Sequence, residues 1–269
     1  MNNFIKKLYR YFLKKQIEKV KLRLNKMGNN RKCYICNNTF NHYSKWRGGT
    51  KAVPLWLSKL EIIGGDFDNF GCPYCNSTDR ERHLFMYFDK LNLWDKIGKY
   101  EILHFAPETN LRKKIEKYAP LKYVKADLYS QDITIQKIDA TAISSKEATF
   151  DLVICNHVME HITDYRSALK EFFRVLKPGG MAILQTPYSK LLIKNFEDEG
   201  INTNGLRLIF YGQEDHVRIF GERTFFQSLI DTGFIVNRME HANFLKELDS
   251  RYFGVSEEED LIQVIKPSS

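Results

Sequence analysis

The chain has 269 residues, of which 43% are hydrophobic and 28% are charged, and its formal net charge is +8. This length and composition predict one soluble domain with appendages. They exclude a membrane-spanning protein, because no apolar run approaches the roughly 18–20 residues that a bilayer requires. The N-terminus is interrupted by charges and lacks the apolar core of a signal peptide, so we expect a cytoplasmic protein.

The excess positive charge lies at the start of the chain. Residues 1–32 hold eleven Lys and Arg against Glu18 alone, and the remainder is nearly neutral, which counts against a general nucleic-acid-binding surface. Apolar residues recur there with a helical period, and Gly28 ends the pattern. We predict that residues 1–30 form a basic amphipathic helix. It would either dock on an anionic membrane surface, at the inner membrane face, or pack against the body or a partner.

Two Cys-x-x-Cys pairs lie in residues 31–80, and they supply Cys33, Cys36, Cys72 and Cys75. Four thiolates can close a tetrahedral structural Zn²⁺ site, and a reducing compartment favours metal over the alternative, redox or disulfide chemistry. Such a zinc-ribbon-like module has too little core to hold itself, so the metal would stabilise it. The stretch between the pairs is long, and we expect it to carry extra structure in residues 46–60.

Residues 81–98 have the spacing of a linking helix, and residues 99–269 then alternate strand and helix patterns in a βαβ series. Strands are expected at residues 101–105, 123–126, 138–139, 150–155, 181–185, 234–238 and 260–265, and helices at residues 110–118, 165–176 and 225–231. Cys155 lies inside one of these apolar strands and is expected to be a core residue. Residues 188–222 interrupt the alternation after a strand, where a lid or substrate-binding insertion would lie.

Polar residues follow the expected strands at their carboxyl ends, where ligands bind in an open parallel sheet. Asn156 and His157 follow the apolar run of residues 152–155. Asp127 ends the second strand, where a carboxylate can hold both hydroxyls of a ribose, unless it caps a helix or lies on the surface. Asp139 and Ala140 follow the third strand and would lie beside an adenine, or else form a simple turn.

The first turn, HFAPETN at residues 104–110, differs from the Gly-x-Gly-x-x-Gly turn of dinucleotide folds. It has no glycine, and it contains the carboxylate of Glu108. A carboxylate there would repel phosphates but would tolerate an ammonium or sulfonium group. The turn therefore favours a cationic nucleoside cofactor over NAD.

Two ionisable clusters remain. His157, Glu160 and His161 match the pattern of an inverted zinc-peptidase motif, but they begin at a strand end rather than on one helix, so we do not expect zinc proteolysis. His157 is expected to face the cofactor edge.

The insertion contains the second cluster, the segment DHVR at residues 215–218. His216, oriented by Asp215, is a candidate general base, and Arg218 could hold a carboxylate or phosphate. The alternative is that the segment is a hydrogen-bonded loop anchor.

With these motifs in place, residues 101–265 resemble a class I S-adenosylmethionine-dependent methyltransferase of the type-11 kind. More narrowly, the stretches CPYCNSTDRERH, ILHFAPE, VICNHVMEHI, RVLKPGG and GQEDHVRIFG resemble a bacterial subgroup that carries a double Cys-x-x-Cys module. The resemblance implies a Rossmann-like, seven-stranded, mostly parallel sheet with an antiparallel last strand, accompanied by the N-terminal helix and the zinc module. It implies that the cofactor-binding residues are His104, Phe105, Ala106, Pro107, Glu108, Asp127, Leu128, Asp139, Ala140, Asn156 and His157.

The function expected from the residues and the resemblance is methyl transfer from S-adenosylmethionine to an oxygen or nitrogen of a small-molecule or sugar-like acceptor. The catalytic candidates are His216, Asp215, His157 and Arg218. One alternative is a non-catalytic scaffold that binds a macromolecule or membrane through the zinc module and basic helix. Another is an RNA methyltransferase that uses both as a clamp, although the nearly neutral body disfavours it.

Overall fold

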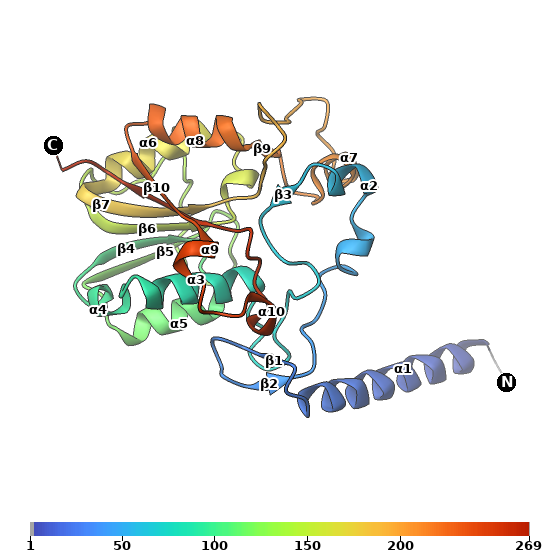
Figure 1. Cartoon of the computed structure of the whole chain (residues 1–269). Coiled ribbons are helices and arrows are strands. Elements are labelled where there is room, and N and C mark those ends of the chain that lie inside the picture. Colours follow the sequence, from blue (N-terminus) through green and yellow to red (C-terminus); the bar gives the residue numbers. More distant parts are fainter. Residues whose placement is uncertain (1–2, 269) are drawn as a thin grey trace.

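Six strands form the centre of the molecule, which the computed structural model describes from residue 3 to residue 268. These strands are β4 (Glu101–Phe105), β5 (Lys122–Ala126), β6 (Phe150–Asn156), β7 (Leu176–Gln185), β10 (Ile235–Met239) and β11 (Leu261–Ile265). They form one sheet in the order β10-β11-β7-β6-β4-β5 (Figure 1). Strand β11 is antiparallel to both of its neighbours, and the β4, β5, β6 and β7 pairings are parallel. The expected Rossmann-like, mostly parallel sheet with an antiparallel last strand is confirmed.

The sheet has six strands rather than the seven expected. Next to β5 the chain forms a single bridge, between Gln136 and Ala126, the last residue of β5, and residues 138–139 form no strand. In the segment before this bridge, backbone groups bond within a local turn instead of to a neighbouring strand. The Asp132 carboxylate accepts from the backbone N–H and the hydroxyl of Thr134. Such side-chain bonds compete with a strand ladder, which explains why this edge ends after one bridge.

The order of the strands reverses between β4 and β6. From β4 the chain continues to β5 on one side, whereas β6 leads to β7 on the other side. A crevice opens beyond the carboxyl ends of strands at such a switch point, and this is where ligands bind in open α/β sheets. The fold therefore directs attention to the residues that follow Phe105 and Asn156.

Helices cover both faces of the sheet. Successive side chains of β6 point to opposite faces, and those of both faces are buried, so both faces need a covering layer. Val153 and Cys155 face α6 (Tyr165–Val175) and α8 (Glu222–Asp231), whereas Leu152 and Ile154 face the opposite helices. The opposite layer consists of α3 (Asp79–Lys90), α4 (Trp94–Ile97) and α5 (Thr109–Lys117) (Figure 1). Cys155 is fully buried, as expected of a core residue.

A separate small layer, which we call the cap, combines residues 50–63 with the insertion at residues 188–221. Its elements are η1 (Thr50–Ala52), α2 (Leu55–Ser58), β3 (Ile62–Ile63), β8 (Tyr188–Ser189), α7 (Asn204–Tyr211) and β9 (Phe220–Gly221). The three strands pair in the order β3-β8-β9, and Leu57 packs with Tyr211 and Ile219 (Figure 1). The extra structure expected in residues 46–60 is present, and it holds the insertion in place.

The helix α1 (Asn3–Lys26) projects from the body beside the short strands β1 (Arg31–Lys32) and β2 (Thr39–Phe40) (Figure 1). Its last turn is fixed by the Asn25 side chain, which bonds to the backbone N–H and C=O of His42. Apolar side chains of one helix face stay exposed, among them Ile17, Val20 and Leu24. Within residues 3–268, no helix is both long and apolar enough to span a bilayer.

The fully buried Arg82 of α3 joins the cysteine module to the C-terminal part of the chain. Its guanidinium lies over the ring of Tyr43 and donates to five backbone carbonyls: Asn69, Phe70 and Ser77 of the module, and Phe253 and Gly254, at the end of α10 (Ser250–Phe253). All five guanidinium N–H groups therefore have acceptors, which is the condition for burying a charge.

We predict that Arg82→Met lowers the free energy of unfolding by about 3–5 kcal/mol, because several buried carbonyls lose their donors. Chemical denaturation followed by circular dichroism measures this change. Arg251→Met, at an exposed position of α10, is the matched control and should change stability little. Equal stability of the two variants would contradict the account of this joint.

Candidate functional site

The turn after β4 is closed by side chains rather than by glycines. Ala106 has a positive φ of 44° and is exposed, and Glu108 follows at the N-terminus of α5. The Glu108 carboxylate lies 2.9 Å from Nε2 of His104 and accepts from Nδ2 of Asn156 at 2.5 Å. Burial raises the pKa of Glu108, but the bonds from His104 and Asn156 more than offset this, so its pKa is lowered and the group is ionised at neutral pH.

Two of the predicted cofactor contacts in this turn cannot reach a ligand directly through their side chains. His104 is fully buried between Glu108 and the hydroxyl of Tyr123, which lies 2.9 Å from its Nδ1. Phe105 is also buried, at 3% exposure. His104 thus acts on a ligand only by orienting Glu108, whereas Ala106 and Pro107 are accessible at the rim.

The turn after β5 presents a carboxylate at the same edge. Oδ1 of Asp127 accepts from the backbone N–H groups of Tyr129 and Ser130, and the residue is half-buried. Leu128 is exposed beside it. Asp139 accepts from the N–H and hydroxyl of Thr141, and Ala140 behind it is buried. The ends of the paired strands β4 and β5 thus place Glu108 and Asp127 in neighbouring turns beside the switch point, and we call this edge of the sheet the shelf.

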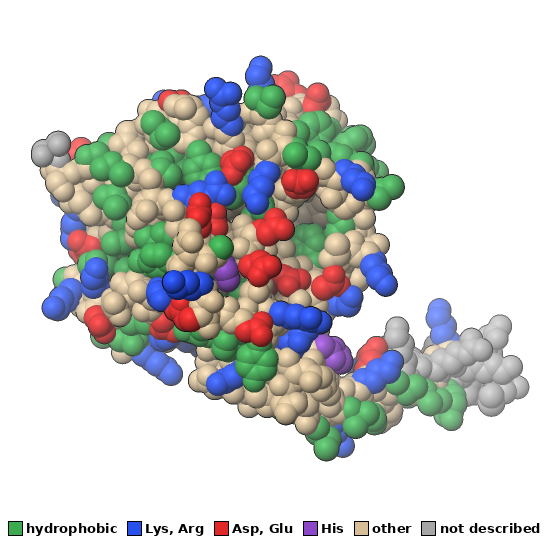
Figure 2. Space-filling model, viewed as in Figure 1, with side chains coloured by type: hydrophobic (Ala, Val, Ile, Leu, Met, Phe, Trp, Pro, Cys, Tyr) green, Lys and Arg blue, Asp and Glu red, His purple; other side chains and the backbone are tan. Residues whose placement is uncertain are grey.

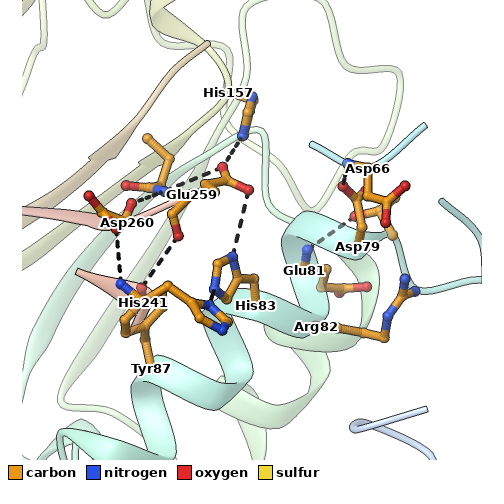
Figure 3. A network of polar contacts seen from close by, with 12 residues as sticks. Asp66, Asp79, Glu81, Arg82, His83, Tyr87, His157, His241, Glu259 and Asp260 are labelled. Carbon is orange, nitrogen blue, oxygen red and sulfur yellow. Dashed lines mark hydrogen bonds and ion pairs between the residues drawn. The ribbon is translucent and has the colours of Figure 1, made fainter. Parts of the chain in front are cut away.

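Asn156 and His157 end β6 and are both buried, and His157 takes a left-handed conformation with φ of 55°. The side chain of His157 does not project along the shelf. Its Nε2 lies 3.1 Å from Oε1 of Glu259, and Oε2 of Glu259 lies 3.6 Å from Nδ1 of His83 (Figure 3). The carboxylates of Glu160 and Glu259 raise the pKa of His157 against the opposing effect of burial, and His157 and His83 likewise outweigh burial in Glu259, whose pKa is lowered.

The network continues away from the sheet. Nε2 of His83 lies 2.8 Å from Nδ1 of His241, in the short helix α9 (His241–Phe244), and Asp260 accepts from the backbone N–H of His241 (Figure 3). A crevice too narrow to admit a water molecule is lined by Arg80, His83, Leu84, Tyr87, Asn156, Gln185 and Glu259. Acidic side chains gather in the middle of the face seen in Figure 2.

The DHVR segment comes close to the end of β6, but not in the predicted arrangement. Among the described residues, no hydrogen bond joins Asp215 to His216; instead, Oδ2 of Asp215 lies 3.3 Å from Nδ1 of His161. Burial lowers the pKa of His216 to about 4, so its imidazole is neutral at pH 7 and is a weak base.

Arg218 is committed inside the protein. It is 4% exposed, pairs with Glu197 at 2.6 Å and donates to the carbonyls of Ile162 and Thr163. This placement favours the alternative reading of the segment, a loop anchor, over the predicted anion contact.

The four predicted metal ligands come together. Each pair forms a knuckle in which the asparagine after the second cysteine, Asn37 or Asn76, has a left-handed conformation. The Sγ atoms of Cys33 and Cys75 are 3.6 Å apart, those of Cys36 and Cys72 are 3.8 Å apart, and all four lie within 4.8 Å of one another. A tetrahedron with Zn–S bonds of about 2.3 Å has edges of about 3.8 Å, so the four thiols fit such an ion. A disulfide would require about 2.05 Å.

Part of the chain that contains this sheet edge is similar to known proteins. Residues 101–184 match the sequence profile of a family described as "Methyltransferase domain". The match relates this segment to methyltransferase domains. The matched segment runs from β4 to β7 and so contains the switch point. No curated protein sequence matches the chain.

Several solved methyltransferases have a similar fold. An S-adenosylmethionine-dependent methyltransferase from Mesorhizobium loti is 13% identical, with a TM-score of 0.48, and the match covers 67% of this chain and 97% of that one. A methyltransferase from Archaeoglobus fulgidus is 15% identical, with a TM-score of 0.47, and the match covers 71% of this chain and 95% of that one. The Burkholderia thailandensis 1,6-didemethyltoxoflavin-N1-methyltransferase with bound S-adenosylhomocysteine is 13% identical, with a TM-score of 0.44, and the match covers 68% of this chain and 78% of that one. At these identities and TM-scores the likenesses are partial and say nothing of the acceptor.

Sequence reasoning missed several residues that support the site. Arg80 and His83 lie in the run DRERH, which has the spacing of an ordinary helix, and Glu259 lies in an acidic run that reads as surface. Glu81 was missed too, although it accepts from the backbone N–H groups of Asn110 and Leu111 at the N-terminus of α5. The density of ionisable residues in one helix, α3, is the signal in the sequence that could have indicated these residues. It does not predict which residues they contact.

Proposed function

We propose that the protein transfers a methyl group from S-adenosylmethionine to an oxygen or nitrogen of a small-molecule or sugar-like acceptor. The observation that carries the proposal is the shelf at the switch point, where the ionised Glu108 and the accessible Asp127 lie at neighbouring strand ends. When bound, S-adenosylmethionine supplies a methyl group on a positively charged sulfur. Glu108 adds negative charge at the turn that would face this cation, and Asp127 would accept from the ribose hydroxyls.

The remaining residues of the shelf complete the binding role. Asp139, Ala140 and Leu128 would border the adenine, and Ala106 and Pro107 would leave backbone groups close to the methionine part. Asn156 fixes the Glu108 carboxylate, and His104 fixes it from behind. In this account most of the rate enhancement comes from holding the acceptor in line with the sulfonium.

The two alternatives differ from this proposal in measurable ways. A non-catalytic scaffold would retain cofactor affinity and methylate none of the acceptors offered. An RNA methyltransferase would bind RNA with a steep salt dependence that is lost when residues 1–32 are deleted.

We predict that Asp127→Ala weakens binding of S-adenosylhomocysteine by about 10- to 100-fold, because hydrogen bonds between a carboxylate and hydroxyls are worth about 1.5–3 kcal/mol. Isothermal titration calorimetry measures the affinity. Asp127→Asn keeps an oxygen that can accept from Tyr129 and Ser130, and it separates loss of charge from damage to the turn.

Asp95→Ala, at an exposed position on α4, is the matched control and should bind like the unmodified protein. If Asp127→Ala binds with unchanged affinity, Asp127 is not the ribose residue. If the unmodified protein binds neither S-adenosylmethionine nor S-adenosylhomocysteine, the proposed function fails.

We also propose that Cys33, Cys36, Cys72 and Cys75 hold a structural Zn²⁺ ion. The support is the mutual distance of their sulfur atoms and the small core of the module, which consists of these cysteines with Phe40 and Tyr43. Four thiolates leave no open position on the ion, so its role would be to stabilise the fold.

The zinc proposal predicts one Zn²⁺ per purified chain by elemental analysis. Cys36→Ser combined with Cys75→Ser should lose the metal and unfold at a lower temperature, because the module has little else to hold it. Cys155→Ala, which removes the buried thiol of the sheet, is the control and should retain a full equivalent of zinc. A metal-free purified protein with full thermal stability would contradict the proposal.

A third proposal concerns the helix α1, which we place on an anionic membrane surface. The support is the exposure of Ile17, Val20 and Leu24, at 48%, 54% and 59%, on a helix that also carries basic side chains. An apolar face flanked by Lys and Arg binds at an anionic lipid interface through both burial and charge.

Vesicle sedimentation tests this placement. The protein should bind vesicles that contain phosphatidylglycerol and not vesicles of phosphatidylcholine alone, and Ile17→Asp with Leu24→Asp should weaken binding at least about tenfold. Leu121→Asp with Ile133→Asp, at exposed positions of the body, should leave binding unchanged. Absence of binding to anionic vesicles would refute the proposal.

A further inference from the structure

Three ionisable side chains that no cofactor role uses meet beside the end of β6. Glu160 and His161 belong to the short 3-10 helix η2 (Met159–His161), and His216 belongs to the cap. One carboxylate oxygen of Glu160 and one ring nitrogen from each histidine all lie within 4.8 Å of one another. The rings of His161 and His216 meet edge to face, with centroids 4.7 Å apart. We propose that these three side chains hold a divalent first-row metal ion that binds a hydroxyl group of the acceptor.

The fold holds the two contributing segments together independently of any ion. The backbone N–H of Val217 donates to the carbonyl of Glu160 at 2.9 Å, one residue away from His216. Arg218 next to it is buried and bonded to the carbonyls of Ile162 and Thr163, just after His161. The loop anchor thus fixes the three ligands in advance, which lowers the entropic cost of binding an ion.

A second observation concerns the carboxylate of Glu160. Glu160 is 1% exposed, and its Oε2 accepts from the hydroxyl of Thr186 at 3.0 Å, whereas its Oε1 has no hydrogen-bond partner among the described residues. The closest recorded group to Oε1, Nδ1 of His157, is 3.5 Å away, and it too has no hydrogen-bond partner. That contact is an ion pair without a hydrogen bond, whereas buried carboxylate oxygens are nearly always hydrogen-bonded or coordinated, so this oxygen has capacity for a further ligand.

The residues around the site have the arrangement of an outer coordination sphere. His157 is held by Glu259, which is held in turn by His83, so the group next to the Glu160 carboxylate is fixed in orientation (Figure 3). On the solvent side, Asp215 lies 3.3 Å from the Nδ1 of His161. Carboxylate–imidazole pairs of this kind orient metal ligands and raise their basicity.

The donor set indicates the kind of ion. One carboxylate and two imidazoles suit Mn²⁺, Fe²⁺, Co²⁺ or Zn²⁺, and three protein ligands leave positions open for other oxygens. The site is accessible, because the His161 side chain is 28% exposed. An acceptor that offers a hydroxyl oxygen, and better a second oxygen beside it, fits these open positions.

The role of the ion rests on the proposed methyl transfer, whereas the site rests on geometry alone. A hydroxyl bound to a divalent cation loses its proton to water or buffer more readily. The resulting oxygen attacks the methyl carbon, a C–O bond forms, and the C–S bond breaks with its electron pair going to sulfur. The products are a methyl ether, S-adenosylhomocysteine and the released proton.

Titration of the full chain with Mn²⁺, followed by electron paramagnetic resonance of the free ion, tests the site. Mn²⁺ prefers oxygen and nitrogen ligands and does not compete for the four thiolates. We expect one saturable Mn²⁺ site per chain, and binding weakened at least about tenfold in His161→Ala with His216→Ala. His42→Ala, an exposed histidine of the cysteine module, is the matched control and should bind normally. Circular dichroism confirms that each variant is folded, and His161→Gln alone serves if the double variant is not.

The outcomes separate this inference from the proposed function. No saturable site in the unmodified protein, or a site that survives the removal of His161 and His216, overturns the inference. Calorimetry with S-adenosylhomocysteine on the same preparation reports on the cofactor: affinity for it without a Mn²⁺ site refutes only the metal proposal. A Mn²⁺ site lost in the double variant, in a chain that binds no cofactor, supports the site and refutes the methyltransferase.

Discussion

The carboxylate of Glu108 is the interaction on which the candidate site depends. It bonds to Asn156 at the end of β6 and to His104 within β4, so it joins the two strands between which the sheet order reverses. A glycine-rich turn would leave this space to a phosphate. Here a side chain fills it and brings a negative charge, and the site that results is suited to a cation. The same bond explains why neither His104 nor Asn156 is free to act alone.

A line of buried imidazoles and carboxylates extends this constraint through the molecule. His241, His83, Glu259, His157 and Glu160 follow one another at contacts between 2.8 and 3.6 Å. Each residue comes from a different element: α9, α3, the segment before β11, the end of β6 and η2. Buried charges are tolerated only when paired. These contacts therefore fix how the helix α3 and the segment before β11 dock against the site. The cap is attached to the last residue of this line, because the backbone N–H of Val217 donates to the carbonyl of Glu160.

Much of the sheet could be predicted from the sequence because strands buried on both faces are continuous apolar runs, as in β6. The shelf residues Asp127 and Asn156 were predictable for the same reason, since they are the polar residues that end such runs. The third strand was predicted wrongly: the chain beside β5 forms one bridge, at Gln136, after a turn that is held by side-chain bonds of Asp132. The pairing of Asp215 with His161, the burial of His104 and the part played by Glu259 depend on contacts across long stretches of chain. Local spacing carries no information about such contacts.

The central claim is that a nucleoside with a charged sulfur, or its neutral product, lies along the ends of β4, β5 and β6. Hydrogen–deuterium exchange with and without S-adenosylhomocysteine tests this most directly, because it locates the ligand without needing the acceptor. The account predicts slower exchange in residues 104–110, 126–129, 139–141 and 154–157, with little change in the cysteine module. Unchanged exchange in all four segments at saturating ligand, or protection confined to the cap, would contradict it.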